Sequence, residues 1–305
     1  MTAAGERAPD ESFVSVAAAL AANLTIAAAK GTAAALTGSP ALLAETLHTV
    51  ADAGNEVFLW IAIRRSRRPA DASHPFGYGP ERYYWALLAA IGMFVIGGAV
   101  SVWNGVHALI HPPELADFWV GVGVLVIALV LDSASRTVAV RQLRRQARSR
   151  GLSLRELTRE SADPTVITVY YEDTVDVLGA ALALVALVLH RVTGSGVPDA
   201  LASVVIGLLL GYLAMRLTER NRRLLSNQAV PERYVQRLSE RLEREATIDA
   251  VTRLEAVYLG PAEVLVVADV RMADGANVAA ALAQAREHVE RDVPAVARMY
   301  LTPVE

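Results

Sequence analysis

Six long apolar stretches constrain this chain more than any other feature of its sequence. Each has about 20 residues or more, which is the length a helix needs to cross the hydrocarbon core of a bilayer. Hydrophobic residues make up 53% of the chain, above the usual share in a soluble domain. We therefore expect an α-helical membrane protein with a six-helix transmembrane bundle, its spans at about Phe13–Gly31, Pro40–Ile63, Tyr83–Leu109, Phe118–Val140, Val166–Val192 and Pro198–Leu217.

Basic residues indicate how these predicted spans are oriented. The connection 64–82 holds five arginines and the segment 141–159 holds seven, whereas the turns around Thr37 and Pro112 hold none. Cytoplasmic loops carry such an excess of arginine and lysine. We therefore expect a multi-pass protein of the cell membrane with both termini in the cytoplasm. The acidic start of the chain lacks a cleavage motif, so no removable signal peptide is expected.

The composition also excludes several classes of function. The net charge is −3 and the basic residues lie in loops beside the spans, so no nucleic-acid partner is expected. Cysteine is absent, which leaves only nitrogen and oxygen atoms to hold a metal. No HExxH motif supports an intramembrane metalloprotease, and we expect no enzyme.

Ligand-type side chains interrupt two of the apolar stretches. His48 and Asp52 are four residues apart, so they lie on one face of a helix, and Glu45 extends this stripe. Glu172 and Asp176 repeat the spacing in another stretch. Two such helices can enclose one divalent cation. Ionisable groups at membrane depth are costly and usually functional; interhelical hydrogen bonding alone is the alternative.

Other polar residues within the spans favour structural roles. Asp132 and Arg136 are four residues apart and are expected to form an ion pair. Asp173 points about 100° away from Glu172 around the helix. We therefore expect it to support the ligands from outside the site or to contact another helix. We expect Lys30 to bond a neighbouring helix or to extend to the interface. His190, at the end of a span, is assigned no chemistry.

A small soluble domain is predicted after Asn227. Apolar residues recur at helical spacing after Pro231, and two apolar runs then form a β-hairpin. The predicted order is α-β-β-α-β, as in ferredoxin-like domains, with strands at 251–258, 263–272 and 298–303 and a second helix at 278–291. At about 75 residues such a domain is marginally stable alone, so we expect it to dimerise. The chain thus divides into a cytoplasmic tail (1–12), a transmembrane domain (13–228) and a cytoplasmic C-terminal domain (229–305).

Several of these motifs together resemble the cation diffusion facilitator family of metal/proton antiporters. They are HTVAD in the second span, DASHPFGYGPER in the following loop, the acidic pair of the fifth span and the terminal domain. The run HPFGYG is the most specific of them. The segments DPTVITVYYED and DALASVVIG resemble the branch that contains the mitochondrial zinc transporters. The resemblance covers nearly the whole chain.

The resemblance implies a four-ligand transport site made of His48, Asp52, Glu172 and Asp176. A typical member has histidine where this chain has Glu172. A carboxylate adds a negative charge and a hard oxygen ligand, which moves the preference some way from Zn²⁺ towards Mn²⁺ or Fe²⁺. Zn²⁺ is still the expected cargo, with Mn²⁺, Fe²⁺ and Co²⁺ as alternatives.

Two further family sites are incomplete in this sequence. In the loop, Asp71 and His74 match the family pattern, but Tyr78 replaces a histidine, so we expect a weak or vacant metal site and a structured turn. The terminal domain has a single histidine, His288, where relatives hold a binuclear cluster. We therefore expect this domain to form the homodimer without sensing metal.

The expected function is export of a divalent transition metal in exchange for protons, by alternating access, from a site between the second and fifth spans. Protons are the coupling ion, because metal and protons compete for the same ligands. A non-transporting membrane scaffold with a structural charge cluster is the alternative from a different class.

Overall fold

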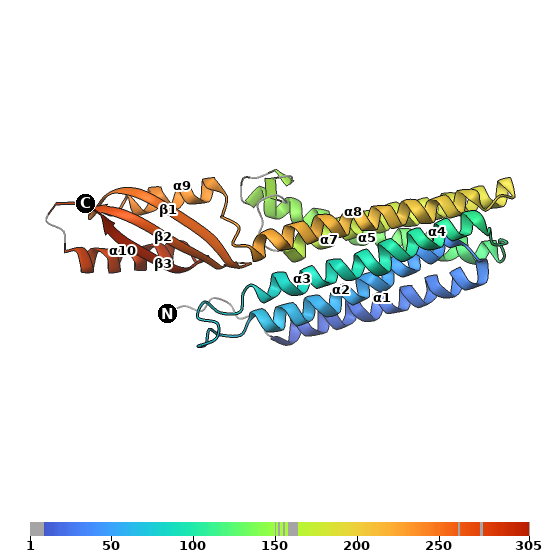
Figure 1. Cartoon of the computed structure of the whole chain (residues 1–305), viewed down its shortest axis with the longest axis horizontal. Coiled ribbons are helices and arrows are strands. Elements are labelled where there is room, and N and C mark those ends of the chain that lie inside the picture. Colours follow the sequence, from blue (N-terminus) through green and yellow to red (C-terminus); the bar gives the residue numbers. More distant parts are fainter. Residues whose placement is uncertain are drawn as a thin grey trace. The chain divides into compact units, whose positions relative to one another are not determined.

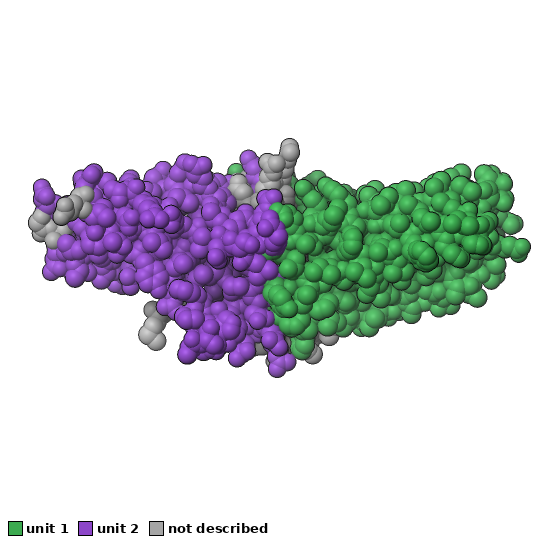
Figure 2. Space-filling view, in the orientation of Figure 1, with its two compact units in different colours: residues 1–63, 84–154, 165–221 green, residues 64–83, 155–164, 222–305 purple. Residues whose placement is uncertain are grey.

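The computed structural model describes residues 9–149, 151, 153–154, 156–157, 164–261, 263–274 and 277–304. Long helices come first and a small sheet with two helices follows (Figure 1). The chain forms two compact units, shown in different colours in Figure 2. Unit 1 comprises Met1–Ile63, Tyr84–Leu154 and Thr165–Asn221, and unit 2 comprises Arg64–Tyr83, Arg155–Pro164 and Arg222–Glu305.

The helices of unit 1 run side by side along its length (Figure 1). Gly38 and Ser39 separate the first two helices. Gly38 has φ 71°, a left-handed conformation suited to ending a helix. The Ser39 hydroxyl accepts a hydrogen bond from the Leu42 N–H at 3.1 Å, at the start of the second helix. The helices, some of which continue into unit 2, are α1 (Pro9–Thr37), α2 (Pro40–Ser66), α3 (Glu81–Gly92), the π-helix η1 (Met93–Ala99), α4 (Val100–Ile110), α5 (Phe118–Ser149), α7 (Pro164–Thr193) and α8 (Val197–Leu225).

Four helical stretches of the described residues are long and apolar enough to cross a membrane. They are Glu81–Ile110, Phe118–Arg148, Tyr170–Thr193 and Val197–Leu225, and they correspond to the last four predicted spans. α1, with 29 residues, and α2, with 27, are also long enough to cross a membrane, but they are not among these four stretches. The expectation of six spans therefore stays a prediction for these two helices.

Small residues let the helices of unit 1 approach closely. α1 packs against α5, and a buried apolar cluster that includes Leu42, Leu125 and Leu187 joins α2, α5 and α7. η1 lies against α8, where a Cβ on Gly207 would come within 2.8 Å of the Gly98 carbonyl oxygen. Close approach through small residues is how helices associate in lipid, where apolar side chains gain nothing by meeting each other.

Unit 2 contains the α-β-β-α-β domain, so the predicted order of elements is confirmed. Its sheet has the order β1-β2-β3, with β1 and β2 antiparallel and β2 and β3 parallel. Both helices pack on this sheet over a core that includes Leu238, Val266 and Val289. The elements are α9 (Glu232–Leu242), β1 (Ile248–Gly260), β2 (Glu263–Met272), α10 (Val278–Asp292) and β3 (Val296–Val304).

The loop between α2 and α3 also packs on this sheet. Gly79 lies against the backbone of Leu259 and Gly260, and a Cβ at residue 79 would overlap the Leu259 carbonyl. Tyr83 is fully buried and packs with Leu224 and Tyr258. The HPFGYG motif therefore belongs to the same compact unit as β1.

Candidate metal centre

His48, Asp52 and Asp176 meet inside unit 1. Nε2 of His48 lies 2.8 Å from Oδ1 of Asp176, and its Nδ1 lies 3.6 Å from Oδ1 of Asp52. One ligand atom from each residue lies within 4.8 Å of the other two. Within the described ranges, this is the one group of three or more histidine and carboxylate side chains close enough to share a metal ion.

His48 and Asp52 have buried ligand atoms that lack hydrogen-bond partners, whereas Asp176 is partly exposed. His48 has no exposed surface, and neither of its ring nitrogens makes a hydrogen bond of good geometry; the same holds for Oδ1 of Asp52. Buried polar atoms in folded proteins are nearly always paired. A cation between α2 and α7 would complete them, so this donor set suits a metal ion.

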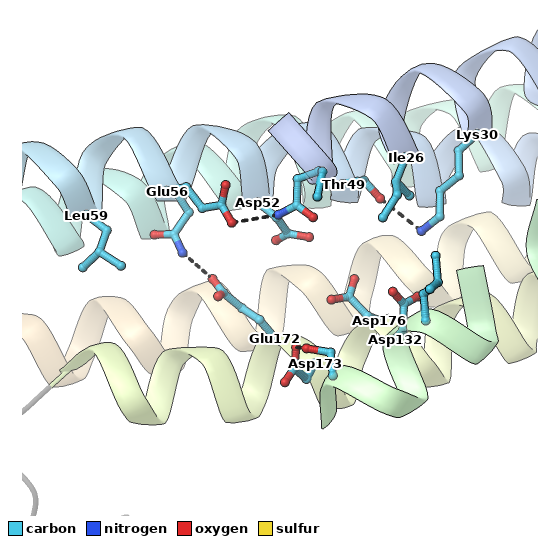
Figure 3. A pocket seen from close by; sticks show the side chains of 15 residues that line it. Ile26, Lys30, Thr49, Asp52, Glu56, Leu59, Asp132, Glu172, Asp173 and Asp176 are labelled. Carbon is cyan, nitrogen blue, oxygen red and sulfur yellow. Dashed lines mark hydrogen bonds between the residues drawn. The ribbon is translucent and has the colours of Figure 1, made fainter. Parts of the chain in front are cut away.

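Glu172, the fourth predicted ligand, lies near this group but has a different partner. Its Oε1 accepts a hydrogen bond from Nδ2 of Asn55 at 2.7 Å. Figure 3 shows Glu172 and Asp176 on α7, facing Asp52 on α2. The three carboxylates line one cavity, but Glu172 is not among the three grouped ligand residues.

The cavity has a volume of about 610 Å³ and is lined by α1, α2, α5 and α7. Three more carboxylates line it: Glu56, Asp132 and Asp173. Glu56 accepts a hydrogen bond from Asn23 at 3.0 Å, and Asp173 accepts one from Ser135 of α5 at 3.2 Å. Asp173 thus meets a neighbouring helix, as predicted. The excess of carboxylates makes the cavity attractive to cations.

The predicted ion pair of Asp132 with Arg136 is not formed. Arg136 Nε donates instead to the Thr174 hydroxyl on α7 at 3.3 Å, and Oδ2 of Asp132 is buried without a hydrogen-bond partner. Asp132 faces the cavity (Figure 3). The prediction was wrong because helical spacing allows such a pair but does not account for a partner on another helix.

Lys30 bonds a neighbouring helix, as expected, but its buried ion pair with Glu45 was not identified from the sequence. Nζ of Lys30 lies 3.1 Å from Oε2 of Glu45 and 3.0 Å from the Thr49 hydroxyl. Both charged side chains are almost completely buried. The one available signal was that a lysine and a glutamate occupy neighbouring apolar stretches, where an unpaired charge is costly.

A second buried pair lies where α7 ends and α8 begins. Nδ1 of His190 is 3.5 Å from Oδ2 of Asp199, and both side chains are buried. Oδ1 of Asp199 accepts hydrogen bonds from the Ser39 hydroxyl at 2.8 Å and the Ala41 N–H at 3.3 Å. His190 is therefore part of a helix junction with α2 and is not a simple interfacial residue.

The loop residues Asp71 and His74 form a hydrogen-bonded turn. Oδ1 of Asp71 accepts from Ser73 and from the His74 N–H, and Oδ2 accepts from the Tyr78 hydroxyl at 2.8 Å. The bonds from Ser73, Tyr78 and His74 hold the pKa of Asp71 well below its usual range. His74 stacks on Tyr78 with ring centroids 3.9 Å apart. Both carboxylate oxygens are thus engaged, as in the structured turn that we expected.

His288 of the terminal domain pairs with a carboxylate and not with other histidines. Its Nδ1 lies 2.9 Å from Oε1 of Glu245, which also accepts from Nη1 of Arg241 at 2.7 Å. Arg241 bonds Asp292 as well. This network ties the end of α9 to α10.

Comparison with known proteins identifies the family. Residues 16–226 match the cation efflux transmembrane domain. The chain belongs to the cation efflux family. The chain is accordingly a multi-pass membrane protein, and the resemblance to cation diffusion facilitators is confirmed.

Relatives in the cation efflux family include proteins named for zinc and for metal tolerance. The chain is 34% identical over 234 residues to the human mitochondrial proton-coupled zinc antiporter SLC30A9, covering 77% of this chain and 41% of the relative. It is 34% identical over 228 residues to metal tolerance protein C4 of Arabidopsis thaliana, covering 73% and 49%. For the cation-efflux pump FieF of Escherichia coli O139:H28 (strain E24377A / ETEC) the identity is 31% over 221 residues, covering 71% and 63%. The chain spans less than half the length of the first two of these relatives. The predicted resemblance to the branch with the mitochondrial zinc transporters is confirmed.

Proposed function

We propose that this protein exports a divalent transition metal in exchange for protons. Zn²⁺ is the proposed cargo, and Mn²⁺, Fe²⁺ and Co²⁺ are the alternatives. The observation that carries this proposal is the group His48, Asp52 and Asp176, whose ligand atoms lie within 4.8 Å of one another inside a membrane protein. The family supports it, because the human relative is named a proton-coupled zinc antiporter.

The proposed site closes with a small movement. Neighbouring ligand atoms lie about 3.4 Å apart in a tetrahedral zinc site with bonds near 2.1 Å. Atoms of the group that lie up to 4.8 Å apart must approach by roughly 1 Å, whereas Nε2 of His48 and Oδ1 of Asp176, at 2.8 Å, must separate slightly. Glu172 becomes the fourth ligand by releasing Asn55 and turning towards Asp176. Four protein ligands replace the hydration shell of the ion, which gives the site its selectivity.

Proton exchange follows from the chemistry of these ligands. A bound metal needs a neutral His48 and ionised Asp52, Glu172 and Asp176, so metal and protons exclude one another. Alternating access of the bundle to the two sides then couples their movements in opposite directions. The metal is the cargo and not a resident cofactor, and the protein is not an enzyme.

The proposed topology has six spans in the cell membrane, including α1 and α2, with both termini in the cytoplasm. The arginines of the loop 64–82 support this orientation through the positive-inside rule. The terminal domain forms the homodimer. Lipid and a second copy of the chain are the expected partners.

One observation favours a second cargo. Glu172 supplies a hard anionic oxygen within the cavity that holds Asp52 and Asp176, and such ligands suit Mn²⁺ and Fe²⁺. A transporter of the same family that is selective for Mn²⁺ or Fe²⁺ is therefore the alternative.

Transport by the purified protein in proteoliposomes tests the proposal. With Zn²⁺, Mn²⁺, Fe²⁺ and Co²⁺ compared, we expect Zn²⁺ flux to be fastest, to speed up when an opposed proton gradient is imposed and to slow when an ionophore removes it. Apparent affinity should fall from about pH 8 to about pH 6, where histidine gains a proton. Flux indifferent to pH and gradient would refute antiport, and absence of flux would favour the scaffold.

A further inference from the structure

The ion pair of Lys30 and Glu45 lies directly beside the proposed metal site. Glu45 and Thr49, the two partners of Lys30, stand on either side of His48 in α2. Lys30 itself lines the acidic cavity and lies across it from Asp176 and Asp132 (Figure 3). A buried ion pair usually contributes little net stability, so its position calls for a reason besides stability.

Glu45 also touches α7. Its Oε1 is buried and has no hydrogen-bond partner. This oxygen lies against Gly179 so closely that a Cβ at residue 179 would overlap it, and that Cβ would lie 3.1 Å from Cδ of Glu45. One carboxylate is thus held by Lys30 of α1 on one side and meets the bare backbone of α7 on the other.

Gly179 shares a face of α7 with a proposed ligand. It follows Asp176 by three residues, which places both on one side of the helix. Oδ1 of Asp176 reaches Nε2 of His48 at 2.8 Å, three residues from Glu45 on α2. The contact between Glu45 and Gly179 therefore limits how closely the two ligand-bearing helices approach.

We propose that Lys30, Glu45 and Gly179 act together as a spacer that fixes the separation of α2 and α7, and so sets the size of divalent ion that the site binds best. Lys30 holds the Glu45 carboxylate in place, and Gly179 lets α7 come near enough for Asp176 to reach His48. These are positioning residues, since none of them is a proposed ligand. The inference rests on the proposed metal site.

Gly179→Ala tests the spacer in the full-length protein. The added methyl group pushes α7 away from Glu45, so Zn²⁺ binding by calorimetry should weaken about 10- to 100-fold, as for other changes around metal ligands. Binding of Cd²⁺, a larger ion of equal charge, should weaken less. Gly123→Ala in α5 is the matched control, because a Cβ there meets nothing within 4 Å.

A distance measurement makes the test independent of metal. The chain has no cysteine, so spin labels on Leu43→Cys in α2 and Val185→Cys in α7 report the separation of these helices alone. We expect Gly179→Ala to lengthen this distance in the metal-free protein. Glu45→Asp shortens the side chain and keeps its charge. Added to Gly179→Ala, it should bring both the distance between the labels and the Zn²⁺ affinity part of the way back to the wild-type values.

The outcomes separate the spacer from the transport function. An unchanged distance and an unchanged preference between Zn²⁺ and Cd²⁺ in Gly179→Ala would overturn the spacer. A longer distance in a protein that binds no Zn²⁺ even as wild type would keep the fixed separation of α2 and α7, but would overturn the proposed function and with it the effect on ion size. If Gly179→Ala does not fold, Glu45→Asp alone should shorten the distance and favour the smaller ion, and no change in either would count against the spacer.

Discussion

At the scale of single residues, the charge of the proposed ligands decides whether metal binds. Asp52 and Asp176 contribute two of the three clustered ligand groups. We expect Asp52→Ala or Asp176→Ala to reduce Zn²⁺ transport at least about 100-fold in proteoliposomes, because metal-ligand loss exceeds the effect of changes around the ligands. Both variants should remain folded, with the elution volume of the wild type in size-exclusion chromatography.

The control for these variants is a carboxylate outside the cavity. Glu114 is exposed in the connection between α4 and α5, and Glu114→Ala should transport like the wild type. Near-normal transport by both Asp52→Ala and Asp176→Ala would rule out the proposed site.

Glu172 provides a separate test of selectivity. We expect Glu172→His to move the ratio of Zn²⁺ to Mn²⁺ transport towards zinc by about tenfold, because imidazole replaces a hard anionic oxygen. Glu172→Gln, which keeps the shape and the bond to Asn55 but loses the charge, is the matched comparison. An unchanged metal profile in both variants would mean that Glu172 does not contact the cargo.

Some of these residues could be predicted from the sequence, and others could not. Residues four apart lie on the same face of every α-helix, so the common face of His48 and Asp52 was predictable. Lys30 and Glu45 are on different helices, and their pairing depends on how α1 packs against α2. Arg136 has a choice of partners on its own helix and on α7, and spacing alone selects the wrong one.

At the scale of elements, the length of the apolar stretches located the long helices and hydrophobic periodicity located the elements of the terminal domain. The ends and irregularities of these elements depended on tertiary contacts. The hairpin was predicted, yet β1 begins at Ile248, three residues before the apolar run, because the backbone pairing with β2 continues to Met272. The π-helix η1 lies within one apolar stretch. Its wide turn could not be predicted from composition, because the residues of η1 are as apolar as their neighbours.

The network that joins α9 to α10 should make the terminal domain sensitive to acid. Burial opposes ionisation of Glu245, but hydrogen bonds from His288 and Arg241 outweigh it and lower the pKa of the carboxyl. A carboxyl with a lowered pKa in the folded state stabilises the fold above its unfolded value and loses this contribution as pH falls. The free energy of unfolding of the terminal domain should therefore decrease at pH values below about 5.

Hydrogen exchange of the intact protein measures this effect. Amides of α9 and α10 should lose protection between about pH 5 and about pH 3, after correction for the intrinsic rate. Glu245→Gln should lower protection at neutral pH by about 1 kcal/mol or less, and should remove most of the pH dependence. Equal pH profiles for both proteins would show that Glu245 is not responsible.

At the scale of the whole molecule, the terminal domain is expected to hold the dimer while the membrane unit holds the metal. Deleting Pro231–Glu305 should weaken dimerisation and lower expression, since it removes an entire folded core. Zn²⁺ binding should persist, because His48, Asp52 and Asp176 all belong to unit 1. Analytical ultracentrifugation and calorimetry of the truncated protein check the two expectations, and a truncated dimer of full strength would contradict the first.

The contacts of the loop 64–83 with β1 bear on how this chain can be divided into fragments. Gly79 lies against Leu259, and Tyr83 packs with Leu224 and Tyr258. A gene fragment that starts after α8 would encode the sheet without these neighbours and leave Tyr258 and the end of β1 in water. Exposed apolar patches of this kind promote aggregation. A soluble form is better obtained by permuting the chain, so that residues 64–83 are linked ahead of residues 222–305.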